Sequence, residues 1–415
     1  MRCPRCGSET GEDTCPYCGY EIAAGWNDPG DDLKEVLDKI KKVFSIVAII
    51  TFLIYLFANI VLLGWSINIV FPHTFNNSTL IYAVLFLVVP LFKAGGAAFA
   101  VYYIFLVLCI ILSIVGLFYY SRDSIIGFFE SFNTGEKGGN SIFESPIARL
   151  AFLICALMFV HFLYTILVDI GGVTPRTPGL EEEKLWVLIY GLTRAAAWEE
   201  IVVRIPFIGI PMLLLTYVKG KTDWKKYILG GFGLRDRNVI WFILLSSVIF
   251  ATAHLGSWDL YKLLPTFVAG LVFGYLYVKD GLYSCIILHF VWDYTAIYYR
   301  LPGYMLNGVI IVVFIWIVLG VYFTYHYVKS GVTWLIRKPS GVKRKSSERS
   351  EPEERTTAGI DAGFICPNCR NYKAVYTERG KLRCIRCGTD VDPKAKEAKK
   401  ELGGREKMRQ WPPMD

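Results

Sequence analysis

The stretch that decides the fold is Trp198-Glu199-Glu200-Ile201-Val202-Val203-Arg204, which places two adjacent carboxylates inside an apolar run. Two later apolar runs carry Phe250-Ala251-Thr252-Ala253-His254 and His289-Phe290-Val291-Trp292-Asp293. An ionisable side chain near the middle of a bilayer costs about 2.5–3.5 kcal/mol on insertion scales, so such groups mark functional sites. Three sets on separate runs predict an active site within a membrane domain.

Composition favours the same setting. Apolar residues make up 54% of the 415 residues and charged residues 19%. The net charge is +8, but many of the lysines and arginines flank apolar runs, where they set membrane orientation. We therefore expect no nucleic-acid partner. The expected partners are the lipid bilayer and a peptide or membrane-protein substrate.

Span lengths predict the topology, because a helix needs about 20 apolar residues to cross the hydrocarbon. The runs indicate about eight transmembrane helices, at 43–71, 94–120, 147–170, 185–217 (broken near Arg204–Pro206), 239–256, 261–278, 282–299 and 304–328. The run 79–92 is short and contains Pro90, so we expect it to be re-entrant or interfacial. Basic loops favour an even count with both termini in the cytosol, in the plasma membrane.

Eight of the eleven cysteines form four Cys-x-x-Cys pairs. They fall into two modules: Cys3, Cys6, Cys15 and Cys18, then Cys366, Cys369, Cys384 and Cys387. Each module has the four-thiolate spacing of a structural zinc site, with disulfides or redox dithiols as the competing readings. We expect two cytosolic zinc ribbons, through which a cytosolic protein partner is recruited. Cys109, Cys155 and Cys285 stand singly in apolar runs, which is typical of packing residues.

The polar residues of the apolar runs have a defined chemistry. On a helix, Glu200 and Arg204 are neighbours on one face, so the guanidinium can neutralise that carboxylate. Glu199 lies about 100° away around the helix and keeps a free carboxylate, which makes it the better general base for water. One of His254 and His289 can assist the water. The other, with Asp293, can bind the developing oxyanion.

Three further histidines have no such context. His161 stands alone in its span, and His73 and His326 lie near span ends. We interpret these three as structural.

The motifs Glu-Glu-x-x-x-Arg, Phe-x-x-x-His and His-x-x-x-Asp, in this order on separate helices, resemble those of the CPBP family of intramembrane proteases, which includes the type II CAAX prenyl proteases. The resemblance implies an all-helical domain with a cavity in the membrane and hydrolysis without a covalent acyl-enzyme. It implies that Glu199 and His254 activate water, that His289 and Asp293 stabilise the oxyanion, and that Glu200 and Arg204 order the site. In the prenyl proteases the last motif commonly ends in Asn, whereas here Asp293 occupies that place, as in other branches of the family.

The expected fold is an all-α polytopic membrane protein with two small cytosolic zinc ribbons. Its parts are an N-terminal ribbon (1–24), an amphipathic surface helix (25–42, with a partner-binding helix as the alternative), a membrane domain (43–330) with a CPBP-like core (185–299), a flexible charged linker (331–362), a C-terminal ribbon (363–392) and a charged tail (393–415).

Several alternatives stay open. Glu199, His254 and His289 can furnish a three-ligand catalytic zinc with water in the fourth position, or the carboxylate and imidazole can work without metal, which we favour. The preferred function is an intramembrane endopeptidase. The alternatives are a non-catalytic membrane adaptor or immunity-type protein of the same fold, and an ion-coupled carrier that uses the carboxylates as a proton relay.

Overall fold

The computed structural model of this chain describes Cys18, residues 29–134, 142–174, 182–218, 224–234, 236–256 and 258–336, and short strands within 374–391. Contacts divide the chain into two units, Met1–Arg337 and Lys338–Asp415, which are described separately.

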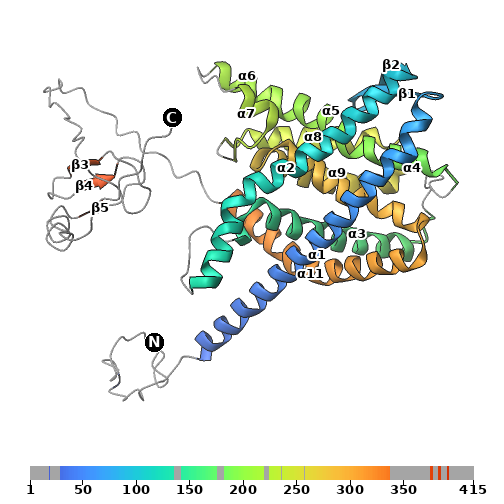
Figure 1. Cartoon of the computed structure of the whole chain (residues 1–415). Coiled ribbons are helices and arrows are strands. Elements are labelled where there is room, and N and C mark those ends of the chain that lie inside the picture. The colour runs from blue at the N-terminus through green and yellow to red at the C-terminus, as the bar shows by residue number, and fades with distance from the viewer. Residues whose placement is uncertain are drawn as a thin grey trace, which may run out of the picture. The chain divides into compact units, whose positions relative to one another are not determined.

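The first unit is mostly helical (Figure 1). Its helices are α1 (Pro29–Thr74), α2 (Ala97–Thr134), η1 (Ile142–Glu144), α3 (Pro146–Ile170), α4 (Leu185–Arg194), η2 (Ala195–Glu199), α5 (Glu200–Arg204), η3 (Ile205–Gly209), α6 (Ile210–Val218), α7 (Trp224–Leu229), α8 (Val239–Ala253), η4 (Leu260–Lys262), α9 (Leu263–Lys279), α10 (Leu282–Asp293), η5 (Tyr294–Arg300) and α11 (Gly303–Ile336). Within the described ranges, six helical segments are long and apolar enough to cross a membrane. The chain is therefore an integral, multi-pass membrane protein.

Two of the eight predicted spans are shorter than the rest. Helix α8 has 15 residues and α10 has 12, so neither is among the six. The count of eight stays a prediction. The segment predicted as a surface helix is continuous with the first span, because α1 runs unbroken from Pro29 to Thr74.

The fourth predicted span is one helical run from Leu185 to Val218. Where the sequence predicts a break, the structure has a π-helical turn, η3, and the run continues. Pro206 lies in this turn and has no N–H to donate. A wider turn accommodates the missing hydrogen bond without ending the helix.

A β-hairpin joins α1 to α2, and it qualifies the all-helical expectation for this unit. Strands β1 (Ser78–Leu85) and β2 (Leu87–Gly95) pair antiparallel and cover the run predicted to be re-entrant or interfacial. Hydropathy alone does not separate such a run from a short helix. Pro90 lies in β2, which is compatible with an edge strand.

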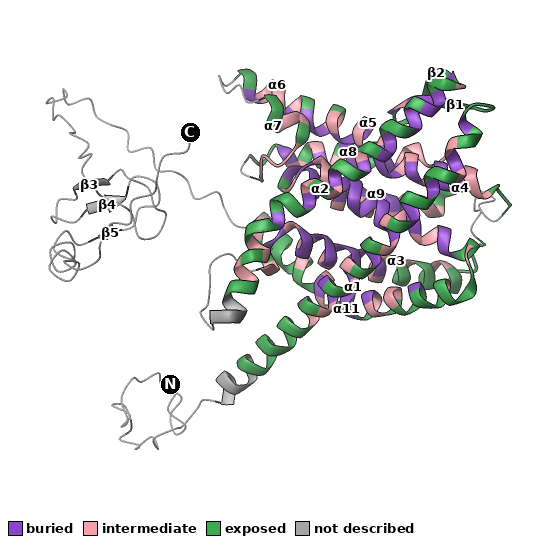
Figure 2. Cartoon of the chain, in the orientation of Figure 1, coloured by how far each residue is buried: buried purple, intermediate pink, exposed green. Residues whose placement is uncertain are grey.

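Helix α10 lies at the centre of the bundle. It packs against α2, α9 and η2, while α3 packs along α11 and α8 along α9. Residues 284–291 of α10 are all buried. Along α1 and α11, by contrast, exposed residues follow the outer side (Figure 2), and many are large and apolar, as a lipid-facing surface requires. The central helix thus holds its polar side chains away from lipid.

Glycines allow α8 and α9 to approach closely. A Cβ on Gly270 would lie 2.9 Å from the Cα of Ser247, and one on Gly274 would lie 2.8 Å from Cγ2 of Ile243. Small residues four apart are a recurrent means of close helix contact in membranes. This contact fixes the position of the C-terminal end of α8 relative to α9.

The second unit contains a three-stranded antiparallel sheet of β3 (Ala374–Tyr376), β4 (Leu382–Cys384) and β5 (Asp390–Val391), in the order β3-β4-β5. The sheet falls within the segment predicted as the C-terminal ribbon, and Cys384 ends β4. Cys18 lies in a turn. The other six ribbon cysteines lie outside the described residues, so both zinc sites stay predictions.

Candidate active site

Six predicted site residues come from three parts of the bundle. Glu199 ends the π-helical turn η2, and Glu200 and Arg204 begin and end α5. His254 caps the C-terminal end of α8. His289 and Asp293 lie one turn apart on α10. The structure brings all six together, and π-helical turns recur at functional sites because they change which side chains share a face.

Glu200 and Arg204 form a buried ion pair. Arg204 Nε donates to Glu200 Oε2 at 2.8 Å, and both side chains are 0% exposed. The guanidinium also donates to Ser246 Oγ at 2.7 Å and lies 4.8 Å from the centre of the Phe250 ring. A buried charge pair needs such additional hydrogen bonds to offset its desolvation. The predicted i,i+4 pairing is therefore present, with Ser246 as a partner that the sequence does not reveal.

His289 lies between two carboxylates. Its Nδ1 is 2.8 Å from Glu200 Oε1, and its Nε2 is 3.4 Å from Asp293 Oδ2. A carboxylate only accepts hydrogen bonds, so each ring nitrogen has a proton to donate. The ring stacks on Phe273 with centroids 5.1 Å apart. This geometry favours an imidazolium that is locked in one orientation.

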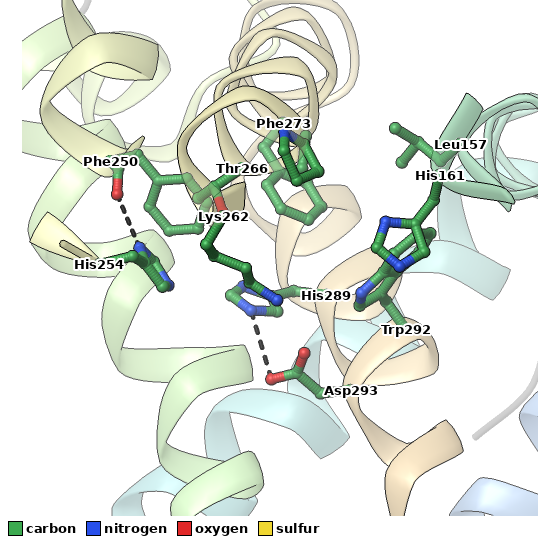
Figure 3. Close-up of a pocket in the computed structure, with 12 residues that line it drawn as sticks. Leu157, His161, Phe250, His254, Lys262, Thr266, Phe273, His289, Trp292 and Asp293 are labelled. Atoms are coloured by element: carbon green, nitrogen blue, oxygen red, sulfur yellow. Dashed lines mark hydrogen bonds and ion pairs between the residues drawn. The ribbon is translucent and has the colours of Figure 1, made fainter. Parts of the chain in front are cut away.

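His254 faces Glu199 across a short gap. His254 Nδ1 lies 2.8 Å from the Phe250 carbonyl oxygen, to which it donates (Figure 3). In the neutral ring the lone pair is then on Nε2, which lies 3.8 Å from Glu199 Oε2. That separation is too long for a direct hydrogen bond and suits one water molecule held by both groups. Two acceptors on one water are the arrangement that general-base catalysis needs.

Tyr82 of β1 contacts a predicted site residue and is not among the residues that the sequence predicts. Its hydroxyl donates to Glu199 Oε1 at 3.3 Å, and the indole of Trp198 donates to the Tyr82 carbonyl at 2.8 Å. The register partner of Tyr82 is Pro90, which has no N–H for that carbonyl. Burial raises the pKa of Tyr82 well above its ordinary value, so the hydroxyl remains a donor.

A cavity of about 70 Å³ adjoins these groups, with room for a few water molecules. It is lined by Leu157, His161, Phe250, His254, Lys262, Pro265, Thr266, Ala269, Phe273, His289, Trp292 and Asp293. Glu199 is not a lining residue and reaches the cavity through its contact with His254. His161, whose isolation in the sequence predicts a structural role, lies in this wall. Its ring is edge-on to Trp292, with centroids 5.4 Å apart.

The proposed zinc ligands do not share a free space. Both nitrogens of His289 face carboxylates, so neither is directed at a metal held by Glu199 and His254. In the described parts of the chain, no three His, Cys, Asp or Glu side chains form a group that could hold a metal ion. The residues present therefore do not fit the three-ligand zinc site in this arrangement.

Residues 181–295 match the family model described as type II CAAX prenyl endopeptidase Rce1-like. No curated protein and no solved structure matches the chain at a significant level. The matched segment contains all six predicted site residues and runs from the start of α4 through α10. Over these residues the chain is thus similar to an intramembrane protease family of the CPBP type.

Proposed function

We propose that this protein is an intramembrane endopeptidase that hydrolyses peptide bonds with water activated by Glu199 and His254. The observation that carries the proposal is the 3.8 Å separation of Glu199 Oε2 and His254 Nε2, with the proton of His254 fixed on Nδ1 by the Phe250 carbonyl. Both groups then accept from the same water. The match to the protease family at 181–295 supports this assignment.

In the first step the water oxygen attacks the carbonyl carbon of the substrate, and Glu199 takes one water proton. His254 Nε2 accepts a hydrogen bond from the other water hydrogen and orients the attack. The π electrons of the carbonyl move to its oxygen, which becomes an oxyanion. In the second step the oxyanion collapses, the C–N bond breaks, and the amine leaves with the proton from Glu199. The carboxylic acid so formed passes its remaining proton through water to the amine, so the products are a carboxylate and an ammonium ion.

Glu200, Arg204 and Tyr82 keep this arrangement in place. Arg204 neutralises Glu200, so Glu200 can bind His289 without competing for the water. Tyr82 holds the Oε1 atom of Glu199, which leaves Oε2 directed at His254. We propose a metal-free mechanism because this geometry provides two bases without a ligand role for His289.

The proposed substrate is a peptide or membrane protein whose cleavable bond reaches the cavity from the bilayer. The matched family is named for prenylated CAAX substrates. A paired assay of one peptide sequence with and without a prenyl group distinguishes that substrate class from a general membrane peptide.

The decisive variant is Glu199→Gln, which keeps the size of the side chain and removes its basicity. We expect purified Glu199→Gln to fold like the wild type and to lose hydrolysis of a cleavable membrane peptide. Glu182→Gln is the matched control, because Glu182 is an exposed glutamate on the chain before α4. Equal activity of Glu199→Gln and wild type would contradict the proposal and favour the non-catalytic adaptor.

A further inference from the structure

Lys262 is a cation in the cavity that the proposed mechanism has not used. It ends η4 and lines the cavity together with His254, His289 and Asp293. Figure 3 shows its side chain extending into the cavity toward His289. Its Nζ lies 4.1 Å from the centre of the Trp258 ring. Among the described residues, no carboxylate forms an ion pair with this ammonium.

The groups around Lys262 stabilise its ammonium and do not occupy its N–H donors. Asp293 lines the same cavity, and its carboxylate attracts a nearby ammonium. The Trp258 face offers a further contact that stabilises a cation and leaves its N–H groups free to turn. Lys262 therefore has donors available for a group that enters the cavity.

The residues expected to bind the oxyanion have no donor to offer. Both N–H groups of His289 face carboxylates, at 2.8 Å for Glu200 and 3.4 Å for Asp293. The Asp293 carboxylate is an acceptor, and its negative charge opposes a second negative charge beside it. An oxyanion in this cavity needs a cation or a hydrogen-bond donor from elsewhere.

We propose that Lys262 is the oxyanion-stabilising residue of the site, in place of the predicted pair His289 and Asp293. This inference rests on the proposed hydrolysis. The Lys262 ammonium donates a hydrogen bond to the carbonyl oxygen as the water attacks the carbon, and no proton leaves the ammonium. Asp293 then orients His289 through Nε2, and His289 anchors the buried carboxylate of Glu200.

The test compares Lys262→Met, Lys262→Gln and Lys262→Arg with wild type on a cleavable membrane peptide. Loss of an oxyanion donor lowers kcat about 100- to 1,000-fold, and we expect this for Lys262→Met with little change in KM. Lys262→Gln retains a neutral donor and Lys262→Arg a charged one, so both are expected to recover part of the activity. Lys279→Met is the matched control, because Lys279 is an exposed lysine at the other end of α9.

A second measurement separates oxyanion binding from a structural role. A phosphinate analogue of the peptide carries a negative charge on a tetrahedral centre, as the intermediate does. For Lys262→Met its affinity is expected to fall by the same factor as kcat/KM, while the affinity for the uncleaved peptide stays close to that of wild type. A loss confined to KM, or an unchanged inhibitor affinity, overturns the role of Lys262.

The two proposals fail in different ways. If wild type cleaves the peptide, Glu199→Gln does not, and Lys262→Met keeps its kcat, then the hydrolysis proposal stands and the oxyanion role is wrong. If Glu199→Gln cleaves as well as wild type, the hydrolysis proposal itself is wrong. A fold defect in Lys262→Met is recognised by its melting temperature, and Lys262→Arg with the inhibitor then decides the question.

Discussion

Arg204 neutralises the Glu200 carboxylate, which is 0% exposed. The burial of Glu200 determines what happens when Arg204 is replaced. Replacing Arg204 with Met strands Glu200 as a buried charge, with only His289 left to compensate it. Removing one partner of a buried pair costs about 3–5 kcal/mol, so we expect Arg204→Met to lower the melting temperature and the activity together. Arg122→Met is the control, because the Arg122–Asp123 pair is exposed and such pairs contribute about 0–1 kcal/mol. Thermal unfolding in detergent measures the melting temperatures of both variants, and hydrolysis of the membrane peptide measures their activities. Equal stability of the two variants would contradict the buried pairing.

Tyr82 is expected to affect the rate without affecting the fold. Tyr82→Phe removes the donor to Glu199 Oε1, and a net hydrogen bond of about 1 kcal/mol corresponds to a loss of about fivefold in kcat. Tyr102→Phe is the control, because the Tyr102 hydroxyl is buried beside Trp198 and has no hydrogen-bond partner among the described residues. The kcat values of the two variants, each compared with that of wild type, decide whether Tyr82 positions the base.

The six site residues that the sequence predicts share one property. Glu199, Glu200, Arg204, His254, His289 and Asp293 are polar groups spaced along apolar helices, where periodicity predicts which of them share a face. Tyr82 and Lys262 were missed because a hairpin and a 3-10 turn bring them into the site from outside that pattern. For Lys262 a signal was present, since it is the sole charged residue in the apolar run 261–278.

At the scale of elements, the contact between α8 and α9 fixes His254 and Lys262 relative to each other. Gly270→Val places a side chain against the backbone of Ser247, where the neighbour cannot move aside. Overpacking costs about 1–3 kcal/mol, so we expect a lower melting temperature and a larger loss of activity as the helices separate. Gly308→Val in α11 is the control, because nothing lies within 4 Å of a Cβ at that position. If both variants unfold at the same temperature, the close approach is not needed.

The helices themselves were largely predictable and the irregular turns were not. Apolar length located both ends of α3, and one end each of α1, α2 and α11, to within a few residues. Helix α1 begins well before its predicted span, and α2 and α11 continue well beyond theirs. The hairpin at Ser78–Gly95 and the π-helical turns at Ala195–Glu199 and Ile205–Gly209 depend on pairing and packing between distant segments. A local pattern carries no information on such contacts.

At the scale of the whole molecule, the cysteine modules predict two zinc ions per chain. Thiolate ligation couples metal binding to local folding, so Cys3→Ser or Cys384→Ser is expected to lower the zinc content by about one ion per chain and to spare the membrane domain. Cys109→Ser is the control, since Cys109 lies in α2 among apolar residues. Elemental analysis of the purified full-length variants measures the change. Two zinc ions retained in Cys384→Ser would contradict the C-terminal site.

The small volume of the cavity beside Lys262 limits how much water the site can hold for the proposed reaction. In the proposed hydrolysis each turnover consumes one water molecule, and a space of about 70 Å³ stores only a few. The site must therefore be rehydrated between turnovers from the aqueous phase. We therefore expect the turnover of the proposed hydrolysis to fall as water activity is lowered with an osmolyte, even when the peptide is saturating.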